Sequence, residues 1–416
     1  MVQLSNDCFA FGGDMISLEQ SHSLLRKKLS PVVGTQNIDI YDSIGFVIAV
    51  DIVAKVNVPS SDNSAVDGYA INYNILNNGF NHKIVGRIPA GSTERVFNTS
   101  GVVRIFTGAP IPNNFDTVYM QEDVIVKDDN ITLPDGQKKD ANVRYQGEDI
   151  TIGDIIITKG TKLTASHIGL IAGQGIKELK VYKKLKVGFF SSGDELMEVG
   201  TDINNINNGL LFDSNRPMVL SCIKQSGFEA IDLGRANDTI ESTKSILKKG
   251  CETCDIIMSA GGMSVGEEDH IQAVLKQHNM DFWKVAIKPG RPVGFGIIDG
   301  IPFVGFPGNP VSVFVTYGLI GLLVLKILSG EEKYQLPRLP IKIGFDVKAK
   351  LGRREFIRVC LENKNDEIIA VKSGEQGSGV LSSTVKATGL VEVFENSQQL
   401  KTGDIVNYIP FYGLYG

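Results

Sequence analysis

The stretch from residue 185 to residue 330 constrains the fold most, because it alternates short apolar runs with amphipathic segments. The apolar runs have the length of buried strands, and the segments between them repeat apolar residues at helical spacing. Such alternation is typical of a parallel sheet with helices on both faces. The expected strands are LKVGFFS, EAIDLG, CDIIMSA and PFVGF, and the expected helices are RPMVLSCIKQSG, TIESTKSILKKG, DHIQAVLKQ and the long run after Pro310.

The segments on either side of this region have a different pattern. Residues 15–29 show helical spacing, with Ser17 as the expected N-cap. From about residue 56 to 144, short alternating runs such as HKIVGRI and GVVRIFTG are separated by Gly, Pro and Asn, which predicts a small β-rich domain. A short helix is expected over 165–173, and the tail over 341–416 predicts a second small β domain.

Composition and charge exclude several classes of protein. The 416 residues carry a formal net charge of -5, which argues against a general nucleic-acid surface. An odd set of five cysteines fits a reducing compartment, and Cys251 and Cys254 are interpreted as incidental thiols because the sequence offers no second pair for zinc. The first residues lack the features of a signal peptide. The apolar run 311–328 is interpreted as a buried helix rather than a membrane span, since it contains Thr316, Tyr317 and Lys326. We therefore expect a cytoplasmic protein without membrane contact.

Three loops at predicted strand ends carry residues suited to chemistry. They are SSGDE (191–195), SAGGMSVGEED (259–269) and GFPGNPVS (305–312). Ligands of such sheets bind beyond the carboxyl ends of the strands. Glycines such as Gly262 let the backbone approach a ligand, and Asn309 followed by Pro310 predicts a helix start able to hold an anion. Each loop alone is more often only a structural turn, but three on one sheet favour a shared pocket.

A cationic segment, FWKVAIKPGRP over 282–292, lies between these loops in the sequence. Lys284 and Lys288 alternate with Val285 and Ile287, which predicts that both lysines share one face of a strand. A cationic face beside carboxylates suits a phosphate ester together with a divalent metal. Neither a Walker A sequence nor a G-x-G-x-x-G is present, so ordinary P-loop or dinucleotide chemistry is not indicated.

Several long motifs in fixed order resemble a known family. They are SDNSAVDGYA (61–70), TGAP (107–110), the GED ending at Asp149, SSGDEL, FDSNRP (212–217), SAGGMSVGEEDH, FWKVAIKPGRP and GFPGNPVS. Together they resemble the molybdopterin molybdenumtransferases, that is, the MoeA proteins and the gephyrin E domain, from about Met15 to the C-terminus. The departures are mild: Val66, Ser192, Met263 and His270 replace the family's usual Met, Thr, Val and Tyr, and none removes a charge.

The resemblance implies an elongated homodimer of four domains, in which an α/β molybdopterin-binding domain resembles the adenylyltransferase fold. The implied division is a discontinuous linking and dimerisation domain (15–55 and 148–184), a β-rich insertion (56–147), the parallel-sheet domain (185–330) and a C-terminal β domain (336–416). The implied reaction takes adenylylated molybdopterin and molybdate, uses Mg²⁺ to cleave the pyrophosphate link, and releases AMP. Molybdopterin adenylyltransferase and molybdoenzyme maturation proteins are the implied protein partners.

The resemblance also assigns site residues. It implies a catalytic set made of Asp67, Asp149, Glu195, Asp238, Asp269, Lys284 and Lys288, with Asp238 and Asp269 as metal ligands. It implies substrate binding by Thr107, Arg358 and Ser378, the last two at an oxyanion site, to which the loop patterns add Gly262, Ser264, Asn309 and Ser312.

Simpler readings of these residues remain open. Asp67 and Asp149 lie at turns, where Asp often bonds locally, Asp238 and Asp269 could be helix N-caps, and Arg358 could be a solvated cross-strand partner. Two other functions also remain: a scaffold that kept the fold and lost turnover, and a different hydrolase built on the same parallel-sheet domain. The hydrolase would not need the SDNSAVDGYA segment or the C-terminal β domain.

Overall fold

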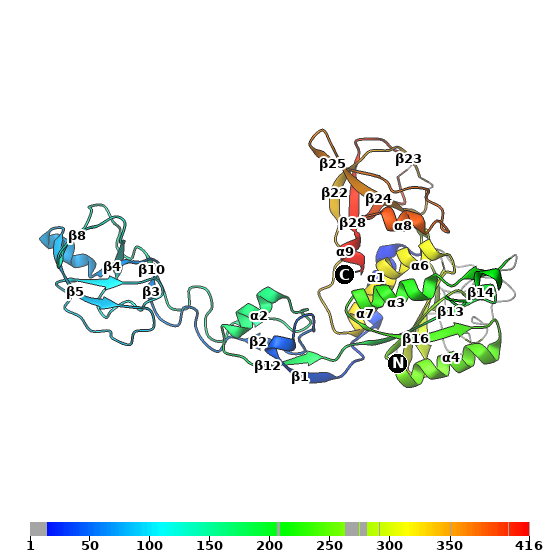
Figure 1. The fold of residues 1–416 in the computed structure, drawn as a ribbon, viewed down its shortest axis with the longest axis horizontal. Coiled ribbons are helices and arrows are strands. Elements are labelled where there is room, and N and C mark those ends of the chain that lie inside the picture. Colours follow the sequence, from blue (N-terminus) through cyan, green and yellow to red (C-terminus); the bar gives the residue numbers. More distant parts are fainter. Residues whose placement is uncertain are drawn as a thin grey trace.

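The computed structural model describes residues 15–205, 209–262, 274, 281–290, 292–349, 351–397 and 399–415. The molecule is elongated, with a β-rich region at one end and the large sheet and C-terminal region together at the other (Figure 1). A narrow middle region joins the two ends. The chain passes through it once on the way out to the β-rich region and once on the way back.

Six strands form the large sheet. They are β13 (Lys186–Ser192), β16 (Glu229–Ala236), β17 (Ile256–Ala260), β18 (Asp281–Lys284), β20 (Pro292–Ile298) and β21 (Ile301–Phe306). Their order is β16-β13-β17-β21-β20-β18. The first four are parallel, as the sequence predicts, whereas β20 and β18 form an antiparallel edge that the sequence patterns did not predict.

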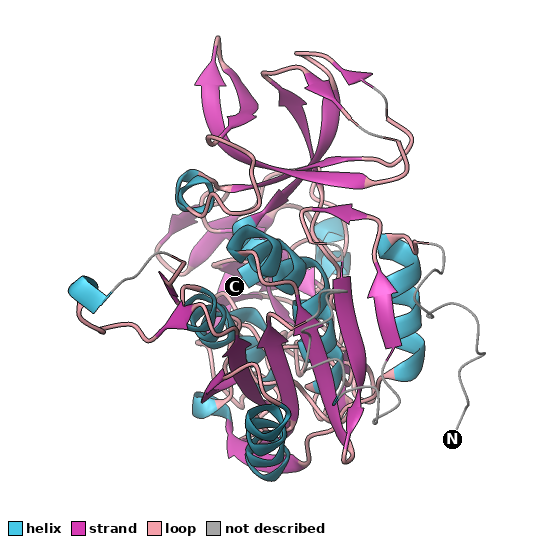
Figure 2. Ribbon diagram, turned by 90° about the vertical axis from the view of Figure 1, so that its right-hand side faces the viewer, coloured by secondary structure: helices cyan, strands magenta, loops and turns pink. Residues whose placement is uncertain are grey.

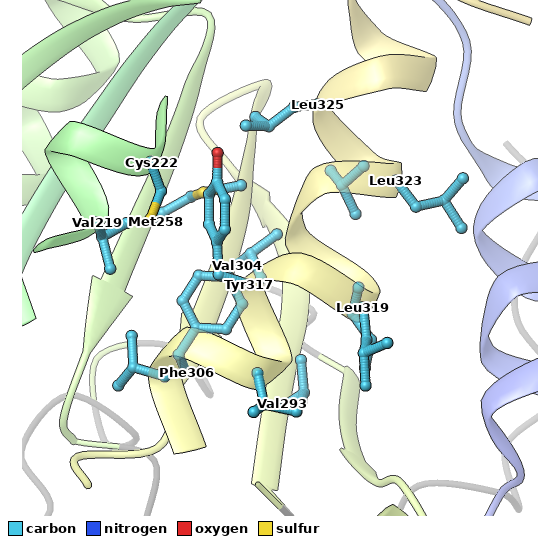
Figure 3. Packing of buried hydrophobic residues seen from close by; sticks show 14 of the residues in the cluster. Val219, Cys222, Met258, Val293, Val304, Phe306, Tyr317, Leu319, Leu323 and Leu325 are labelled. Atoms are coloured by element: carbon cyan, nitrogen blue, oxygen red, sulfur yellow. The ribbon is translucent and has the colours of Figure 1, made fainter. Parts of the chain in front are cut away.

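Helices cover both faces of this sheet, and adjacent residues of β13 pack into different cores. Phe189 lies in the core shared with helices α3 (Asn215–Gln225) and α6 (Pro310–Thr316), and Phe190 lies in the core shared with α4 (Ile240–Thr253). Figure 3 shows the first of these cores, where the ring of Tyr317 meets that of Phe306 edge-on at 6.4 Å between centroids. This two-sided burial is the reason that the strands read as continuous apolar runs.

The long apolar run after Pro310 is helical from Pro310 to Leu328. It consists of α6, a π-helical segment over Tyr317–Gly321, and α7 (Leu322–Leu328). By length and composition this helix could cross a membrane, but 89% of it is buried inside the protein. Its apolar surface is thus used by the core, in agreement with the interpretation from sequence.

The middle region pairs segments from the outward and return passes of the chain. Here β1 (Thr35–Asp39) pairs with β12 (Glu178–Tyr182), and β2 (Ile52–Val53) pairs with β11 (Ile155–Ile157), beside helix α2 (Ala165–Ala172). Before it, helix α1 (Leu18–Lys28) begins at a complete capping box of Ser17 and Gln20, as the N-cap prediction requires.

The β-rich region is a six-stranded sheet in the order β7-β4-β6-β5-β9-β8, with a two-stranded pair β3-β10 beside it. The strands that the alternating runs predict are present. Their bounds are β3 Asn63–Ser64, β4 Gly68–Ile71, β5 Asn81–Ile88, β6 Val102–Ile105, β7 Thr117–Met120, β8 Ile125–Lys127, β9 Asn130–Thr132 and β10 Val143–Arg144.

The C-terminal region closes on itself, because β24 pairs with β26 as well as with β25, and it stands above the large sheet in Figure 2. Its strands are β22 Leu339–Ile343, β23 Val347–Lys348, β24 Arg354–Lys364, β25 Glu367–Lys372, β26 Gly389–Val393, β27 Gln399–Leu400 and β28 Ile405–Pro410, with helices α8 Ser382–Lys386 and α9 Phe411–Tyr415.

One strand of this region comes from the middle of the chain, and it corrects a prediction. Lys284 ends β18 in the large sheet, whereas Lys288 lies in β19 (Ile287–Lys288), which pairs with β24. Between them, Val285 bridges to Ile16, and the Arg354 N–H donates to the Ala286 carbonyl at 2.8 Å. The prediction that both lysines share one face of one strand is therefore wrong, because the chain changes sheets between them.

Candidate functional site

The carboxyl ends of three parallel strands meet at one place. Gly261, after β17, has φ of +90°, and a Cβ added there would lie 2.4 Å from the Ser192 carbonyl oxygen at the end of β13. Its N–H donates to the Phe306 carbonyl at the end of β21, at 3.2 Å. A Cβ added at Gly308, in the next loop, would lie 3.8 Å from the Gly261 Cα. The three glycine-bearing loops of the sequence thus converge, and only a residue without a side chain fits between β13 and β17.

Carboxylates gather at the ends of β13 and β16. Asp238 accepts a hydrogen bond from the Ser192 hydroxyl at 3.0 Å and another from the Asp194 N–H at 3.2 Å. Asp194 in turn accepts from the Asp238 N–H at 3.0 Å. The Glu195 carboxylate folds over Gly193, where an added Cβ would lie 2.4 Å from it. Asp238 is not a helix cap, since Thr239 caps α4 by accepting from the Ser242 N–H.

A second network beside this cluster was missed by the sequence assignment. Asp213 is almost fully buried and accepts from the Ser191 hydroxyl at 3.1 Å and from the Arg216 backbone N–H at 3.1 Å. The Arg216 guanidinium bridges Asp213 to Asp232 and Glu198. Asp213 and Arg216 lie in the FDSNRP motif, which was the available signal. The network holds Ser191 near the end of β13, and Asp194 and Glu195 lie in the loop that follows.

The third loop ends in the predicted helix start. Asn309 is the N-cap of α6, with Pro310 at the first helical position, although its side chain makes no capping hydrogen bond. Asn215 of α3 holds this loop by donating from Nδ2 to the Gly308 carbonyl at 2.7 Å. Ser312 is buried in the first turn. The Val311 N–H donates to the Ser378 carbonyl at 3.1 Å, so a loop of the C-terminal region reaches the beginning of α6.

Arg358, on β24, is fully buried and is not a solvated cross-strand partner. Its Nε donates to the Ser383 hydroxyl at 2.7 Å, and its Nη2 donates to the carbonyls of Glu375 and Gly377 at 3.1 and 3.2 Å. No carboxylate in the described ranges pairs with it. Burial lowers the pKa of this guanidinium. A buried cation without a counter-charge is costly, which favours an anionic ligand at this position.

The remaining cationic and loop residues are only partly placed. Lys288 forms an ion pair with Glu355, with 3.0 Å between Nζ and Oε1, and its side chain is half exposed. Gly262 follows Gly261 with φ of +67°. Asp269, Ser264 and the Lys284 side chain lie outside the described residues.

The two acids of the N-terminal half lie elsewhere. Asp67 accepts from both the N–H and the hydroxyl of Thr107, each at 2.8 Å, and these hydrogen bonds lower the pKa of its carboxyl. Asp67 directly precedes β4, at the far end of the molecule from β13 (Figure 1). Asp149 is exposed in the segment between β10 and β11. Within one chain, neither residue joins the carboxylates at Asp238.

Comparison with known proteins agrees with this architecture. Three family models match in order: the MoeA N-terminal region (domains I and II) over residues 16–175, a probable molybdopterin-binding domain over 188–326, and the MoeA C-terminal region (domain IV) over 340–411. The molybdopterin molybdenumtransferase of Haemophilus influenzae is 35% identical over 407 residues, covering 97% of this chain and 100% of the relative. The chain belongs to the molybdopterin molybdenumtransferase family.

Other members of the molybdopterin molybdenumtransferase family align over most of the chain. The Staphylococcus epidermidis molybdopterin molybdenumtransferase is 28% identical over 383 residues and covers 90% of each chain. The crystal structure of the molybdopterin biosynthesis MoeA protein of Pyrococcus horikoshii superposes with a TM-score of 0.80 at 27% identity, covering 95% of this chain and all of the other. The family resemblance and the fold class inferred from the motifs are therefore confirmed.

Proposed function

We propose that this protein is a molybdopterin molybdenumtransferase that joins molybdate-derived molybdenum to adenylylated molybdopterin and releases AMP. The observation that carries the proposal is the setting of Arg358. Its guanidinium binds the Gly377 carbonyl, and the next residue, Ser378, accepts from the N–H at the beginning of α6. One loop thus joins a buried, unbalanced cation to a helix N-terminus, and both favour an oxyanion. Lys288 of β19 pairs in register with Glu355 of β24 and adds a further ammonium group.

The carboxylates at the strand ends suit the phosphate end of the substrate. Asp194, Glu195 and Asp238 offer hard oxygen atoms, the ligands that Mg²⁺ prefers. The described residues contain no group of three side chains able to hold a metal, so the proposed Mg²⁺ site needs Asp269 beside Asp238. A bound Mg²⁺ would neutralise charge that develops on the phosphate oxygens during cleavage of the pyrophosphate link. The protein's own part is to orient these carboxylates through Ser192 and the Asp194 backbone.

The separation of Asp67 and Asp149 from the large sheet supports a homodimer in which the partner supplies them. Large apolar side chains are exposed on the middle region, among them Tyr41 at 89%, Ile152 at 60%, and Ile44 and Ile155 at 56% each. An exposed apolar surface of this kind favours a protein interface, and a two-fold axis would repeat it on both subunits. Dimerisation through this region could bring the β-rich end of one chain to the large sheet of the other.

A single assay tests the reaction. The purified protein, given adenylylated molybdopterin, Mg²⁺ and molybdate, should release AMP only when molybdate and a divalent metal are both present. Tight pterin binding with no AMP release under any divalent metal would instead favour the non-catalytic scaffold, which kept the fold and lost turnover.

Mixing two inactive variants tests the shared site. Asp67→Asn and Asp238→Asn change residues at opposite ends of one chain. If each site uses both chains, a randomly exchanged mixture should recover about a quarter of full activity, because half of the dimers are mixed and each has one intact site. If the mixture stays inactive although heterodimers have formed, each active site takes both Asp67 and Asp238 from the same chain.

The cellular setting and the partner proteins follow from the same proposal. Cys222, Cys251, Cys254 and Cys360 are free thiols, which suits a reducing compartment such as the cytoplasm. Cys251 and Cys254 have pKa values raised by burial, as expected of structural thiols rather than metal ligands. Molybdopterin adenylyltransferase, as supplier of the adenylylated substrate, and molybdoenzyme maturation proteins, as recipients of the product, are the proposed partners.

A further inference from the structure

A lysine-lined hollow lies at the junction of the middle region and the large sheet, away from the proposed active site. Its walls come from the residues next to β12, from the loop between α3 and β16, and from the end of α7. It is a hollow partly open to solvent, and the space of about 370 Å³ between its walls includes open solvent. Four lysines line it, Lys162, Lys183, Lys184 and Lys326, against one acid, Glu331, which leaves three positive charges in excess. The chain as a whole, by contrast, carries a net negative charge of -5.

The single acid that lines this hollow, which we call the junction pocket, is Glu331, and it already forms an ion pair. Lys326 and Glu331 are both largely buried, and their Nζ and Oε2 atoms lie 2.7 Å apart. The Lys326 ammonium also faces the rings of Phe228 and Tyr334, at 5.6 to 5.7 Å from their centroids. Glu331 is thus the one carboxylate shared by the lysines of the pocket, since its charge also acts on Lys162.

Lys162 is half-buried and forms no ion pair with a carboxylate in the described part of the chain. Burial and then the charge of Lys326 lower its pKa, and the nearby charge of Glu331 only partly opposes them. Its Nζ lies over Gly227, 3.9 Å from where a Cβ would be. Lys184 leans toward the same hollow, with its Nζ 5.3 Å from the centre of the Phe46 ring. The neighbouring Glu332 does not line the pocket and packs against Gly160 instead.

We propose that the junction pocket binds a phosphate dianion between the ammonium groups of Lys162, Lys184 and Lys326. The backbone N–H groups of Gly45, Gly227 and Phe228 already donate to carbonyls, and the Ser226 and Ser329 hydroxyls donate within their own helix turn. Recognition therefore comes from lysine point charges rather than from a shaped cradle of donors, so a phosphate group of any small carrier should fit as well as the free ion.

Binding there would tie the middle region to the large sheet. Lys162 belongs to the middle region, whereas Lys326 lies in α7, in the core of the large sheet. A dianion held by both would replace the repulsion between their ammonium groups with attraction. The expected consequence is a stiffer connection between the β-rich arm and the body of the molecule.

Calorimetric titration of the whole protein with inorganic phosphate tests the site. We expect saturable phosphate binding at the junction pocket, separate from any binding at Arg358. Its dissociation constant should be at least about tenfold higher in Lys162→Gln, the loss of one charge-assisted hydrogen bond. Lys180→Gln is the matched control, because Lys180 is exposed on β12 and does not line the pocket. It should bind phosphate as the wild type does.

Two further variants keep the outcome decisive. If Lys162→Gln does not fold, Lys184→Gln takes its place in the test. Lys184 is exposed, so its replacement leaves the ion pair of Lys326 and Glu331 intact. Arg358→Met removes the proposed oxyanion site and should leave phosphate binding at the junction unchanged. The proposal is wrong if phosphate shows no saturable binding, if the lysine variants bind it as tightly as the wild type, or if only Arg358→Met abolishes binding.

Discussion

Replacing Arg358 with Met separates a ligand-binding role of the buried guanidinium from a role in the fold. The guanidinium makes three hydrogen bonds, to Ser383, Glu375 and Gly377. Hydrogen bonds to charged groups contribute about 1.5–3 kcal/mol each, so the loss of all three costs about 4.5–9 kcal/mol. Removing a buried, unpaired charge recovers a desolvation penalty of several kcal/mol, and the Met side chain stays buried. We therefore expect the free energy of unfolding to change by no more than about 2 kcal/mol.

The assay combines urea unfolding with thermal unfolding in the presence of molybdate. Molybdate should raise the melting temperature of the wild type, because a ligand of the folded state stabilises it, and should have no effect on Arg358→Met. Arg354→Met is the matched control on the same strand. Its guanidinium contacts Glu19, Glu392 and Glu395. The fully buried Glu392 keeps Arg338 as a partner, so the loss of Arg354 should cost about 3 kcal/mol, the lower end for breaking a buried pair. A loss of stability in Arg358→Met as large as in Arg354→Met, with the molybdate effect retained, would refute the reasoning.

Two further predictions concern local geometry. Thr107→Val removes one of the hydrogen bonds that lower the pKa of Asp67, so this pKa should rise toward its ordinary value, as followed by NMR titration. Because the pKa of Asp67 is lowered in the folded state, its ionised carboxyl contributes stability that is fully present above the ordinary pKa. This contribution to stability is lost as the pH falls through the folded-state pKa. In Thr107→Val the loss should begin at a higher pH. Gly261→Ala should destabilise the protein by about 1–3 kcal/mol or more in urea unfolding, because of its positive φ and the contact with the Ser192 carbonyl. Gly300→Ala, with positive φ but open space, and Gly308→Ala, with ordinary contacts, should each cost less, and equal losses in all three would contradict the steric argument.

The sequence predicted the parts of the fold that local patterns control. The four parallel strands appear as apolar runs because both faces of each are buried, and α6 begins at Asn309 because the cap and Pro310 are local signals. The convergence of the three loops was also predictable, since parallel strands end at the same edge of a sheet. The family resemblance then supplied residues such as Asp67, which precedes β4, because no local pattern points to an acid so far from the large sheet.

What the sequence did not predict depends on contacts between distant segments. The alternation around Lys284 and Lys288 is the same whether a strand continues or changes sheets, and only the pairing of β19 with β24 decides it. Asp213 reads as an ordinary loop acid until the fold places Ser191 and Arg216 beside it. Arg358 lies on a strand with mixed polar and apolar residues, so its complete burial depends on the loop at 375–378 folding over it.

The buried cations of this chain differ in how their charge is balanced, and the difference marks the sites that need a ligand. Arg354 contacts three carboxylates and Lys326 pairs with Glu331, so the chain supplies counter-charges where burial is purely structural. Acids outnumber Lys and Arg by 47 to 42, so a counter-charge was available elsewhere too. The fully buried Arg358 and the half-buried Lys162 nevertheless form no ion pair with a carboxylate in the described ranges, although desolvation lowers the pKa of both. Because an unbalanced buried charge costs several kcal/mol, Arg358 favours an anion by its burial. The junction pocket favours one by its excess of lysines over the single Glu331. The two sites use different lysines and arginines on different elements, so loss of one should leave binding at the other intact.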